Sequence, residues 1–283
     1  MAGKPGGNLS EVSETALITL QSRVMEARMP DPILDDPVGC ALYDTLVEQL
    51  SGEVRERIIE RKFSPLLTRH IALRARKYDE LCREFRIKHS RALIVSLGCG
   101  FDTRFWRLGE DPAYMELDLS SLVRTKKEVL GKRISYELKE GSVLDEEWIE
   151  ALSEKQTEHI LFIAEGLFMY LPDRDVVRTL KKLADTFTKS RLVMEVVHEK
   201  YTRGWRKKMV ERKIRSGAGS TAGDYYRYGI RDPRDLESYH RDFNVREAWS
   251  FFEDPDIRPA FLHAFRNLTA FSRTQYTVVA DIV

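Results

Sequence analysis

The stretch ALIVSLGCGFDTRFWRL, residues 92–108, decides the fold of this chain. Its first six residues form an apolar run that ends at Gly98, and Gly100 follows one residue later. A run of this length predicts a buried strand, and two glycines directly after it let the backbone turn tightly and approach a ligand. Asp102 comes next, either as the N-cap of a helix or as a residue that contacts the ligand. The stretch is therefore typical of the first strand, turn and helix of a nucleotide-binding α/β fold.

The sequence before this stretch has a helical pattern. Leu17, Leu20 and Val24 recur at spacings of three and four, which predicts an amphipathic helix over residues 14–28. Asp36-Pro37 and Ser64-Pro65 pair an N-cap residue with a proline in the first turn, and we expect a helix to begin at each. Residues 1–90 are therefore expected to form an N-terminal helical cap.

The helix that begins at Pro65 has an unusual inward stripe. Its members follow spacings of three and four, and they are Leu67, Ile71, Arg74, Tyr78, Leu81 and Phe85. Arg74 stands where apolar side chains stand, and its guanidinium keeps its proton, so it needs an anionic partner or backbone carbonyls. A buried salt bridge to an Asp or Glu and a contact with an anionic ligand are the alternatives.

After residue 90, short apolar runs alternate with helical stretches. The runs cover residues 92–97, 114–117, 134–138, 160–164, 191–197 and 276–282. Continuous apolar strands separated by helices predict a mostly parallel, doubly wound sheet with helices on both faces. Ligands of such sheets bind at the carboxyl ends of the strands.

Residues that follow the second run favour a nucleoside ligand without favouring a dinucleotide. A dinucleotide-binding turn has a third glycine where this chain has Thr103, so a nicotinamide cofactor is disfavoured. Asp118 lies 18 residues after Gly100 at the end of the second run, where an acidic side chain accepts hydrogen bonds from ribose hydroxyls. Glu116, two residues earlier, is interpreted as a structural residue.

The third and fourth runs also end in candidate site residues. Ser142 and Val143 are placed to flank an adenine, with a helix N-cap at Ser142 or Asp145 as the alternative. Glu165 follows the apolar run ILFIA, so its carboxylate emerges at the ligand-binding edge of the sheet. A charge among apolar groups at this edge indicates a functional role. Tyr170 is a candidate for positioning the substrate.

Composition excludes several classes of protein. The 283 residues include 46 Lys and Arg against 45 Asp and Glu, which argues against a nucleic-acid-binding or membrane-surface protein. The three cysteines have neither disulfide-like nor zinc-like spacing, so no metal site is predicted and a reducing cytosol fits best. An apolar N-terminal signal and an apolar run of 18 residues are both absent from the sequence. We expect a soluble, cytoplasmic protein with a frayed N-terminus.

The motifs together resemble the leucine carboxyl methyltransferase superfamily, and most of all its polyketide-type O-methyltransferase branch. The resemblance rests on VSLGCGFDTRFWRL, MELDLSSLVRTKKEVL and LFIAEGLFMYLP, with SRVMEARMPDPILDDP and LRARKYDEL upstream, and it extends from about residue 14 to about residue 200. It implies a Rossmann-like, seven-stranded class I methyltransferase sheet over residues 91–283 that binds S-adenosylmethionine. The implied cofactor-binding residues are Arg74, Gly98, Gly100, Asp102, Asp118, Ser142, Val143 and Glu165.

The resemblance also implies a reaction. Known members of the family methylate carboxylates of proteins or polyketides, so a carboxylate of a small molecule or peptide is the expected acceptor. A hydroxyl or phenol is the alternative acceptor, and it would need a base, for which His198 is the candidate. A nicotinamide-dependent oxidoreductase and a noncatalytic binding module are the remaining alternatives. Residues 197–240 include a basic stretch and the glycine-rich SGAGSTAGD, which we expect to form a lid over the acceptor.

Overall fold

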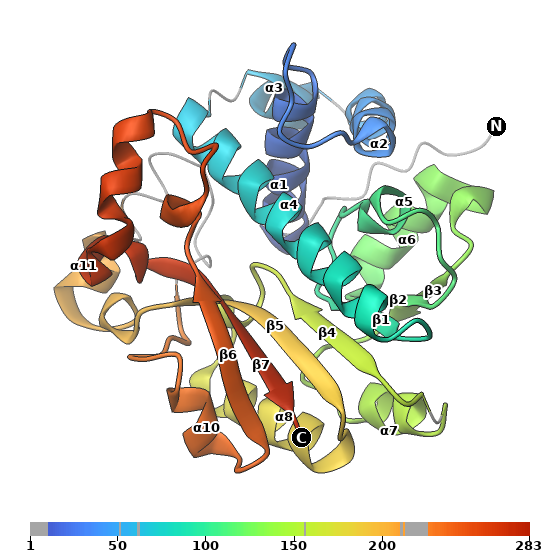
Figure 1. Ribbon diagram of the computed structural model, residues 1–283. Helices are drawn as coiled ribbons and strands as arrows, with labels where there is room; N and C mark the ends of the chain where they lie inside the picture. The colour runs from blue at the N-terminus through green and yellow to red at the C-terminus, as the bar shows by residue number, and fades with distance from the viewer. Residues whose placement is uncertain (1–10, 51, 61–62, 156, 210–211, 213–225) are drawn as a thin grey trace.

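A seven-stranded sheet runs through the described part of the chain (Figure 1). The computed structural model describes residues 11–50, 52–60, 63–155, 157–209, 212 and 226–283. The strands are β1 (Leu93–Leu97), β2 (Tyr114–Asp118), β3 (Glu137–Glu140), β4 (Ile160–Ala164), β5 (Ser190–Val197), β6 (Phe243–Trp249) and β7 (Gln275–Ile282). Their spatial order is β3-β2-β1-β4-β5-β7-β6.

The sheet is parallel except at one strand. β1 to β5 pair in parallel, whereas β7 lies between β5 and β6 and is antiparallel to both. The carboxyl ends of β1, β2, β4 and β5 therefore meet at one edge, and the chain order reverses between β1 and β4. This is the place where open α/β sheets bind their ligands.

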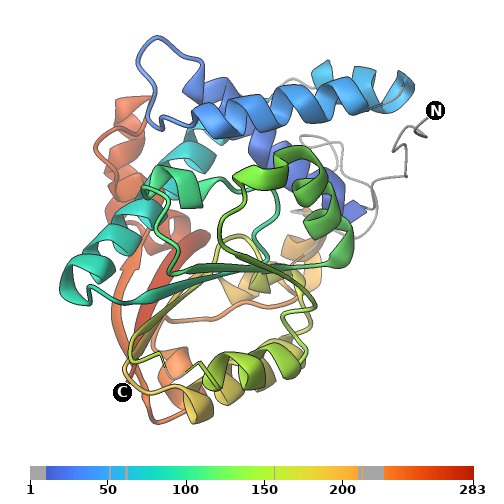
Figure 2. The same ribbon diagram turned by 90° about the vertical axis from the view of Figure 1, so that its right-hand side faces the viewer.

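Helices cover both faces of the sheet, as predicted (Figure 2). The longer helices are α1 (Glu11–Ala27), α2 (Pro37–Gln49), α3 (Gly52–Ile59), α4 (Pro65–Lys88), α6 (Ser120–Leu130), α7 (Glu147–Ser153) and α8 (Asp173–Thr186). The shorter ones are α5 (Arg104–Arg107), α10 (Asp235–Tyr239) and α11 (Thr269–Ser272). α7, α8 and α10 share one apolar core with the sheet, while α4, α5 and α6 share the core on the opposite face. α1 and α2 pack outside this second layer, against α6.

Both predicted N-caps begin helices. The Asp36 carboxylate accepts a hydrogen bond from the Gly39 N–H at 2.9 Å, and the Ser64 hydroxyl accepts one from the Leu67 N–H at 3.2 Å. The expected inward stripe of α4 is also present, since Ile71, Tyr78, Leu81 and Phe85 are buried. The last three belong to the core beneath the sheet, so the second half of α4 covers a sheet face directly.

Two strands differ from the sequence-based prediction. β3 covers Glu137–Glu140 rather than residues 134–138, and β6 was not predicted at all. Both are edge strands with one partner each, and their side chains alternate irregularly between exposed and buried positions. A pattern of continuous apolar residues marks only strands with neighbours on both sides, which explains why these two were misplaced or missed.

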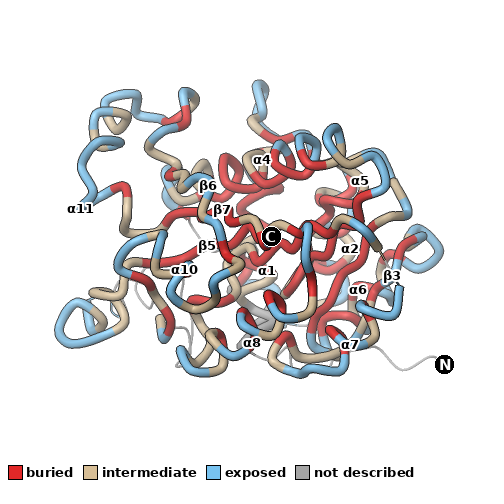
Figure 3. Tube along the Cα trace, turned by 60° about the horizontal axis from the view of Figure 1, so that its bottom comes forward, coloured by how far each residue is buried: buried red, intermediate tan, exposed pale blue. Residues whose placement is uncertain are grey.

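The buried residues follow the central strands. Every residue of β1, β2 and β4 is buried, whereas exposed residues gather on the outer helices and loops, including α10 and the segment before α11 (Figure 3). In the described part of the chain, the helices are too short or too polar to cross a membrane.

Candidate active site

The turn after β1 requires both of its glycines. Gly98 and Gly100 have φ angles of +62° and +53°. Residues other than glycine strongly disfavour this region of backbone conformation. A Cβ on Gly98 would also lie 2.6 Å from Cδ1 of Leu167, so the loop after β4 packs directly against this turn. The predicted tight turn is confirmed, and the group that approaches it closely is the Leu167 side chain.

Asp118, at the end of β2, is tied to the same turn. One carboxylate oxygen accepts the Gly100 N–H at 2.6 Å, and the other accepts the Leu119 N–H at 2.7 Å. Burial raises the pKa of Asp118, and these two N–H groups oppose the shift. Each carboxylate oxygen has a second lone pair, so the side chain has acceptor capacity left for a ribose hydroxyl.

Glu116 is a structural residue, as interpreted from its position. Its carboxylate is fully buried and accepts hydrogen bonds from Lys126 at 2.7 Å and from the Tyr136 hydroxyl at 2.8 Å. The Lys126 ammonium also donates to the Asp102 carbonyl at 2.6 Å, so this pair supports the turn after β1.

Arg74 and Glu165 contact each other. The Arg74 Nε donates to Glu165 at 2.8 Å, and Nη1 donates to Glu195 of β5, also at 2.8 Å. The salt bridge expected as one alternative for Arg74 is therefore present. These two bonds use two of the five N–H groups of the guanidinium. The salt bridge therefore does not rule out a contact with a ligand carboxylate, which stays a prediction.

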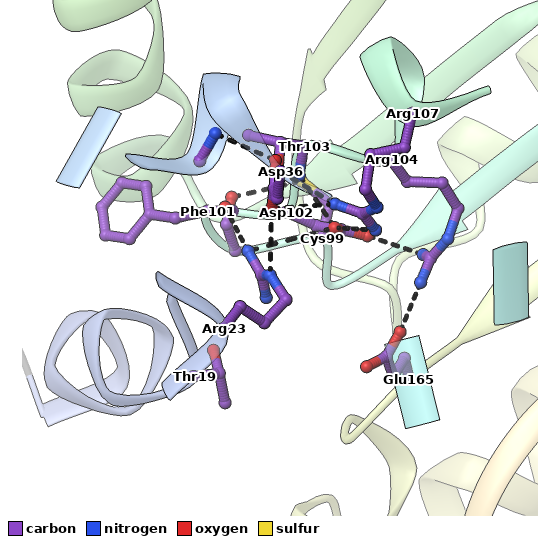
Figure 4. A network of polar contacts seen from close by, with 12 residues as sticks. Thr19, Arg23, Asp36, Cys99, Phe101, Asp102, Thr103, Arg104, Arg107 and Glu165 are labelled. Carbon is purple, nitrogen blue, oxygen red and sulfur yellow. Dashed lines mark hydrogen bonds and ion pairs between the residues drawn. The ribbon is translucent and has the colours of Figure 1, made fainter. Parts of the chain in front are cut away.

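The Asp102-Thr103-Arg104 segment joins this pair to a larger network of charges (Figure 4). Arg104 is fully buried and forms ion pairs with Asp79 at 2.7 Å, Asp102 at 2.6 Å and Glu165 at 2.6 Å. Of the two alternatives for Asp102, the helix N-cap is excluded, because α5 begins at Arg104 with Thr103 in the cap position, and the contact with a ligand stays a prediction. The Asp102 carboxylate faces Arg104 and Arg107 instead, and its ion pairs take the place of a cap.

Arg107 of α5 connects the network to groups on elements that precede the turn in the sequence. Arg107 lies 2.7 Å from Asp79 of α4, 3.0 Å from Asp102 and 3.1 Å from Asp36 of the α2 cap. Arg23 of α1 lies 3.6 Å from Asp36 and donates to the Phe101 carbonyl at 2.8 Å. The helices before residue 90 therefore contribute charged groups to the site.

The arginines keep two of these acids ionised. Burial alone would raise the pKa of Asp102, but Arg104, Arg107 and Arg23 hold it well below its usual range. Burial acts in the same way on Glu165, and Arg74 and Arg104 lower its pKa. Both carboxylates are therefore anionic at neutral pH and available to a cationic ligand.

A pocket of about 320 Å³, which includes space open to solvent, lies against these groups. Its lining residues are Arg23, Ser96, Leu97, Gly98, Cys99, Asp102, Arg104 and Glu165. Of the predicted site residues, the lining contains Gly98, Asp102 and Glu165. Gly100 belongs to the turn that lines the pocket, and Asp118 accepts its N–H group. Arg74 is not a lining residue but donates a hydrogen bond to Glu165, which is.

The loop after β3 excludes one of its two expected alternatives, the helix N-cap. Neither Ser142 nor Asp145 is an N-cap, because α7 begins at Glu147 with Glu146 in the cap position. The two form a local turn, in which Asp145 accepts the Ser142 N–H at 3.1 Å. Val143 is buried in the core, so its side chain is partly committed to packing. Adenine contacts by Ser142 and Val143 stay a prediction.

The candidates for positioning the substrate lie in two places. Tyr170 is half-buried after β4, and its ring centre is 5.7 Å from that of Tyr226. His198 follows β5, and its Nδ1 accepts the Lys200 N–H at 3.2 Å. Burial and the Lys200 charge lower the pKa of His198, which weakens it as a base.

Sequence reasoning missed His70 and Glu195. His70 lies one helical turn before Arg74 and stacks on Phe251 at 4.2 Å; burial and the Arg74 charge lower its pKa to about 3. Glu195 is 1% exposed within β5 and accepts hydrogen bonds from Arg74 and Gln275. An acidic residue between the apolar residues of LVMEVV, residues 192–197, was the available signal.

The sheet order, the reversed β7 and the glycine turn after β1 define an α/β methyltransferase fold. The crystal structure of a DUF574 family protein from Streptomyces avermitilis is similar over 95% of this chain and 97% of that one, with a TM-score of 0.53 and 12% identity. At this identity, the similarity concerns the fold alone.

The chain belongs to the leucine carboxyl methyltransferase family, whose sequence profile matches residues 16–184. The tetracenomycin polyketide synthesis O-methyltransferase TcmP of Streptomyces glaucescens is 27% identical over 262 residues, which cover 89% of this chain and 88% of TcmP. The S-adenosyl-L-methionine-dependent methyltransferase dpfgK of Gibberella zeae is 25% identical over 254 residues, 87% of this chain and 84% of dpfgK. The comparisons confirm the predicted family and class of enzyme, a methyltransferase, and agree with the predicted cofactor.

Proposed function

We propose that this protein transfers the methyl group of S-adenosylmethionine to a carboxylate oxygen of a small, polyketide-like molecule or a peptide, forming a methyl ester. The observation that carries the proposal is the meeting of Gly98, Asp118 and Glu165 at one edge of the sheet, beside a pocket lined by ionised acids. Membership in the leucine carboxyl methyltransferase family supports the choice of a carboxylate.

The residues around the pocket fit this cofactor in donor and acceptor chemistry. Asp118 would accept hydrogen bonds from the ribose hydroxyls, and Glu165 would contact the methionyl ammonium. Arg74 would approach the methionyl carboxylate, while Ser142 and Val143 would flank the adenine. When bound, S-adenosylmethionine supplies a methyl group on a positively charged sulfur, ready for attack by an oxygen.

The protonation states near the pocket favour a carboxylate acceptor over a hydroxyl. A carboxylate is already ionised at neutral pH, so its attack needs no general base. A hydroxyl or phenol would need one, and the candidate His198 uses Nδ1 to accept the Lys200 N–H. His70, with a pKa of about 3, is a poor proton acceptor at neutral pH. The work left to the protein is to align the two reactants and exclude water.

The oxidoreductase alternative has no support in the geometry. The third glycine of a dinucleotide turn is replaced by Thr103, which is fully buried and donates its hydroxyl proton to Asp36 at 2.6 Å.

The proposal is tested with S-adenosylmethionine that carries a radiolabelled methyl group, supplied with matched aromatic carboxylic acids and phenols. Methyl esters release labelled methanol in mild alkali, whereas methyl ethers do not. Alkali-labile label on the acids supports the proposal, and alkali-stable label on the phenols would replace it with the hydroxyl alternative. Protein that binds no S-adenosylmethionine would favour the noncatalytic alternative.

A further inference from the structure

The charges around the pocket do not balance. Within the described residues, the ion pairs join four guanidinium groups to five carboxylates in one continuous network, whose members are Arg23, Arg74, Arg104, Arg107, Asp36, Asp79, Asp102, Glu165 and Glu195. Each of these side chains is at most 13% exposed. With all of its members ionised, the network therefore holds one more negative than positive charge away from bulk water.

The nearest charged groups outside the network do not supply the missing cation. Lys126 contacts the Asp102 carbonyl, but its own charge is matched by Glu116 at 2.7 Å. Asp118 adds a further carboxylate beside the glycine turn, which accepts two backbone N–H groups. An uncompensated carboxylate is costly to bury, so the site favours a cation that arrives with its ligand.

Glu195 is the terminal member of the network. One oxygen accepts from Arg74 and the other from the neutral Gln275 amide at 2.7 Å. Arg74 is already paired with Glu165, so Glu195 shares its only described cationic partner with another acid. Gly166 lies beside this pair, since a Cβ there would be in ordinary van der Waals contact, 3.5 Å from Glu195 and 3.8 Å from Arg74.

We propose that Glu195 is a specificity-determining residue that makes the site prefer a ligand with net positive charge, S-adenosylmethionine, over its uncharged product, S-adenosylhomocysteine. The inference rests on the proposed function. S-adenosylmethionine carries a sulfonium, an ammonium and a carboxylate, and methyl transfer removes the sulfonium charge. The product therefore leaves the surplus negative charge of the network unmatched and binds less tightly.

The surroundings of Glu195 agree with this role. The charged and titratable groups that face it are Arg74 and Glu165, together with the phenols of Tyr78 and Tyr226. Burial raises the pKa of Glu195, Arg74 opposes the shift and Glu165 adds to it. Its ionised form is thus the one that gains most from a nearby cation.

The test measures the dissociation constants of S-adenosylmethionine, S-adenosylhomocysteine and sinefungin by calorimetry. Sinefungin carries an ammonium group in place of the methylated sulfur, so it retains the net positive charge. In Glu195→Gln, which preserves the shape of the side chain and one oxygen that accepts from Arg74, the two cationic ligands should bind on the order of tenfold more weakly because a buried charge is lost. S-adenosylhomocysteine should change less than twofold.

Two further variants complete the design. Gln275→Lys leaves Glu195 in place and supplies a cation beside it, so it should also reduce the preference for cationic ligands. This variant tests the inference even if Glu195→Gln does not fold. Asp281→Asn removes a carboxylate of the neighbouring strand that is paired with Arg191 at 2.6 Å, and it should leave the preference unchanged.

The outcomes separate this inference from the proposed function. If all three ligands weaken equally in Glu195→Gln, the residue acts by shaping the site and the inference is wrong. An unchanged preference in both Glu195→Gln and Gln275→Lys would also overturn it. If the unmodified protein binds none of the three ligands, it is the proposed function that fails.

Discussion

Asp118 offers the most direct test of the cofactor site at the scale of single residues. Asp118→Ala should weaken S-adenosylmethionine binding about 10- to 100-fold, because hydrogen bonds to a charged group contribute roughly 1.5–3 kcal/mol. Calorimetry measures the dissociation constant. Glu140→Ala, at the paired position of β3 and on the surface, is the matched control and should bind normally. Normal affinity in Asp118→Ala would remove the ribose contact from the proposal.

The sequence alone predicts that Asp118→Ala and Glu165→Ala both weaken cofactor binding and leave the fold intact. For Glu165→Ala, the structure predicts a loss of stability in addition. Glu165→Ala would take one partner from the buried Arg74 and Arg104, which keep other carboxylates, so we expect the free energy of unfolding to fall by about 1–3 kcal/mol through the buried donors left without an acceptor. Urea unfolding measures it. Glu80→Ala removes an exposed partner of Arg76 on α4 and should cost less than about 0.5 kcal/mol. Equal stability of the two variants would show that the network contributes little.

His70 makes stability depend on pH. Its pKa falls from 6.5 in the unfolded chain to about 3 in the folded protein, so folding excludes a proton. The stabilisation is complete above pH 6.5 and is lost as the pH falls toward 3. Between pH 7.5 and pH 4.5, the unmodified protein should lose about 2 kcal/mol more stability than His70→Phe, which keeps the stacking on Phe251. Urea unfolding at both pH values checks this, and parallel losses would contradict the low pKa.

Residue identity alone indicated some members of the site but not their partners. Arg74 was recognisable as a charge within an apolar stripe, and Glu165 as a charge directly after an apolar run. Their contact, across 91 residues of sequence, depends on how α4 crosses the sheet, which periodicity does not encode. Asp79 and Arg107 resemble ordinary helix surface residues in the sequence, and only the packing of α4 against α5 buries them.

Strands with a neighbouring strand on each side were easier to predict from the sequence than edge strands with one neighbour. β1 and β4 are buried along their whole length, so their apolar runs identified them. β6 was missed because an edge strand on the surface follows no continuous pattern. The glycine-rich part of the predicted lid, residues 216–224, and the predicted frayed N-terminus, residues 1–10, lie outside the described residues.

The basic stretch after β5 carries a prediction about the acceptor. Lys207 and Lys208 lie within the segment 197–240, which we propose forms a lid that draws an anionic acceptor inward. Lys207→Glu with Lys208→Glu should raise the KM for a carboxylate acceptor several-fold and leave kcat nearly unchanged, through loss of electrostatic steering. Steady-state kinetics at low and high salt measures both. Lys181→Glu on the surface of α8 is the control, and an unchanged KM would exclude the role.

At the scale of the whole molecule, the cofactor should stabilise the fold. A ligand present at 100 times its dissociation constant adds about 2.7 kcal/mol, which for a chain of this size corresponds to an increase in Tm of roughly 5–10 °C. We expect this shift with S-adenosylmethionine and none with NAD in a thermal unfolding assay. A shift with NAD alone would restore the oxidoreductase alternative.

The arrangement of β7 also bears on how the protein is made. Gln275, which holds Glu195, is the first residue of β7, and this strand enters the sheet between β5 and β6. A ribosome must therefore synthesise the chain as far as β7 before the last partner of the Arg74 network exists. Until then, β5 has an open edge and Glu195 lacks its amide, so the network is complete only after β7 has joined the sheet.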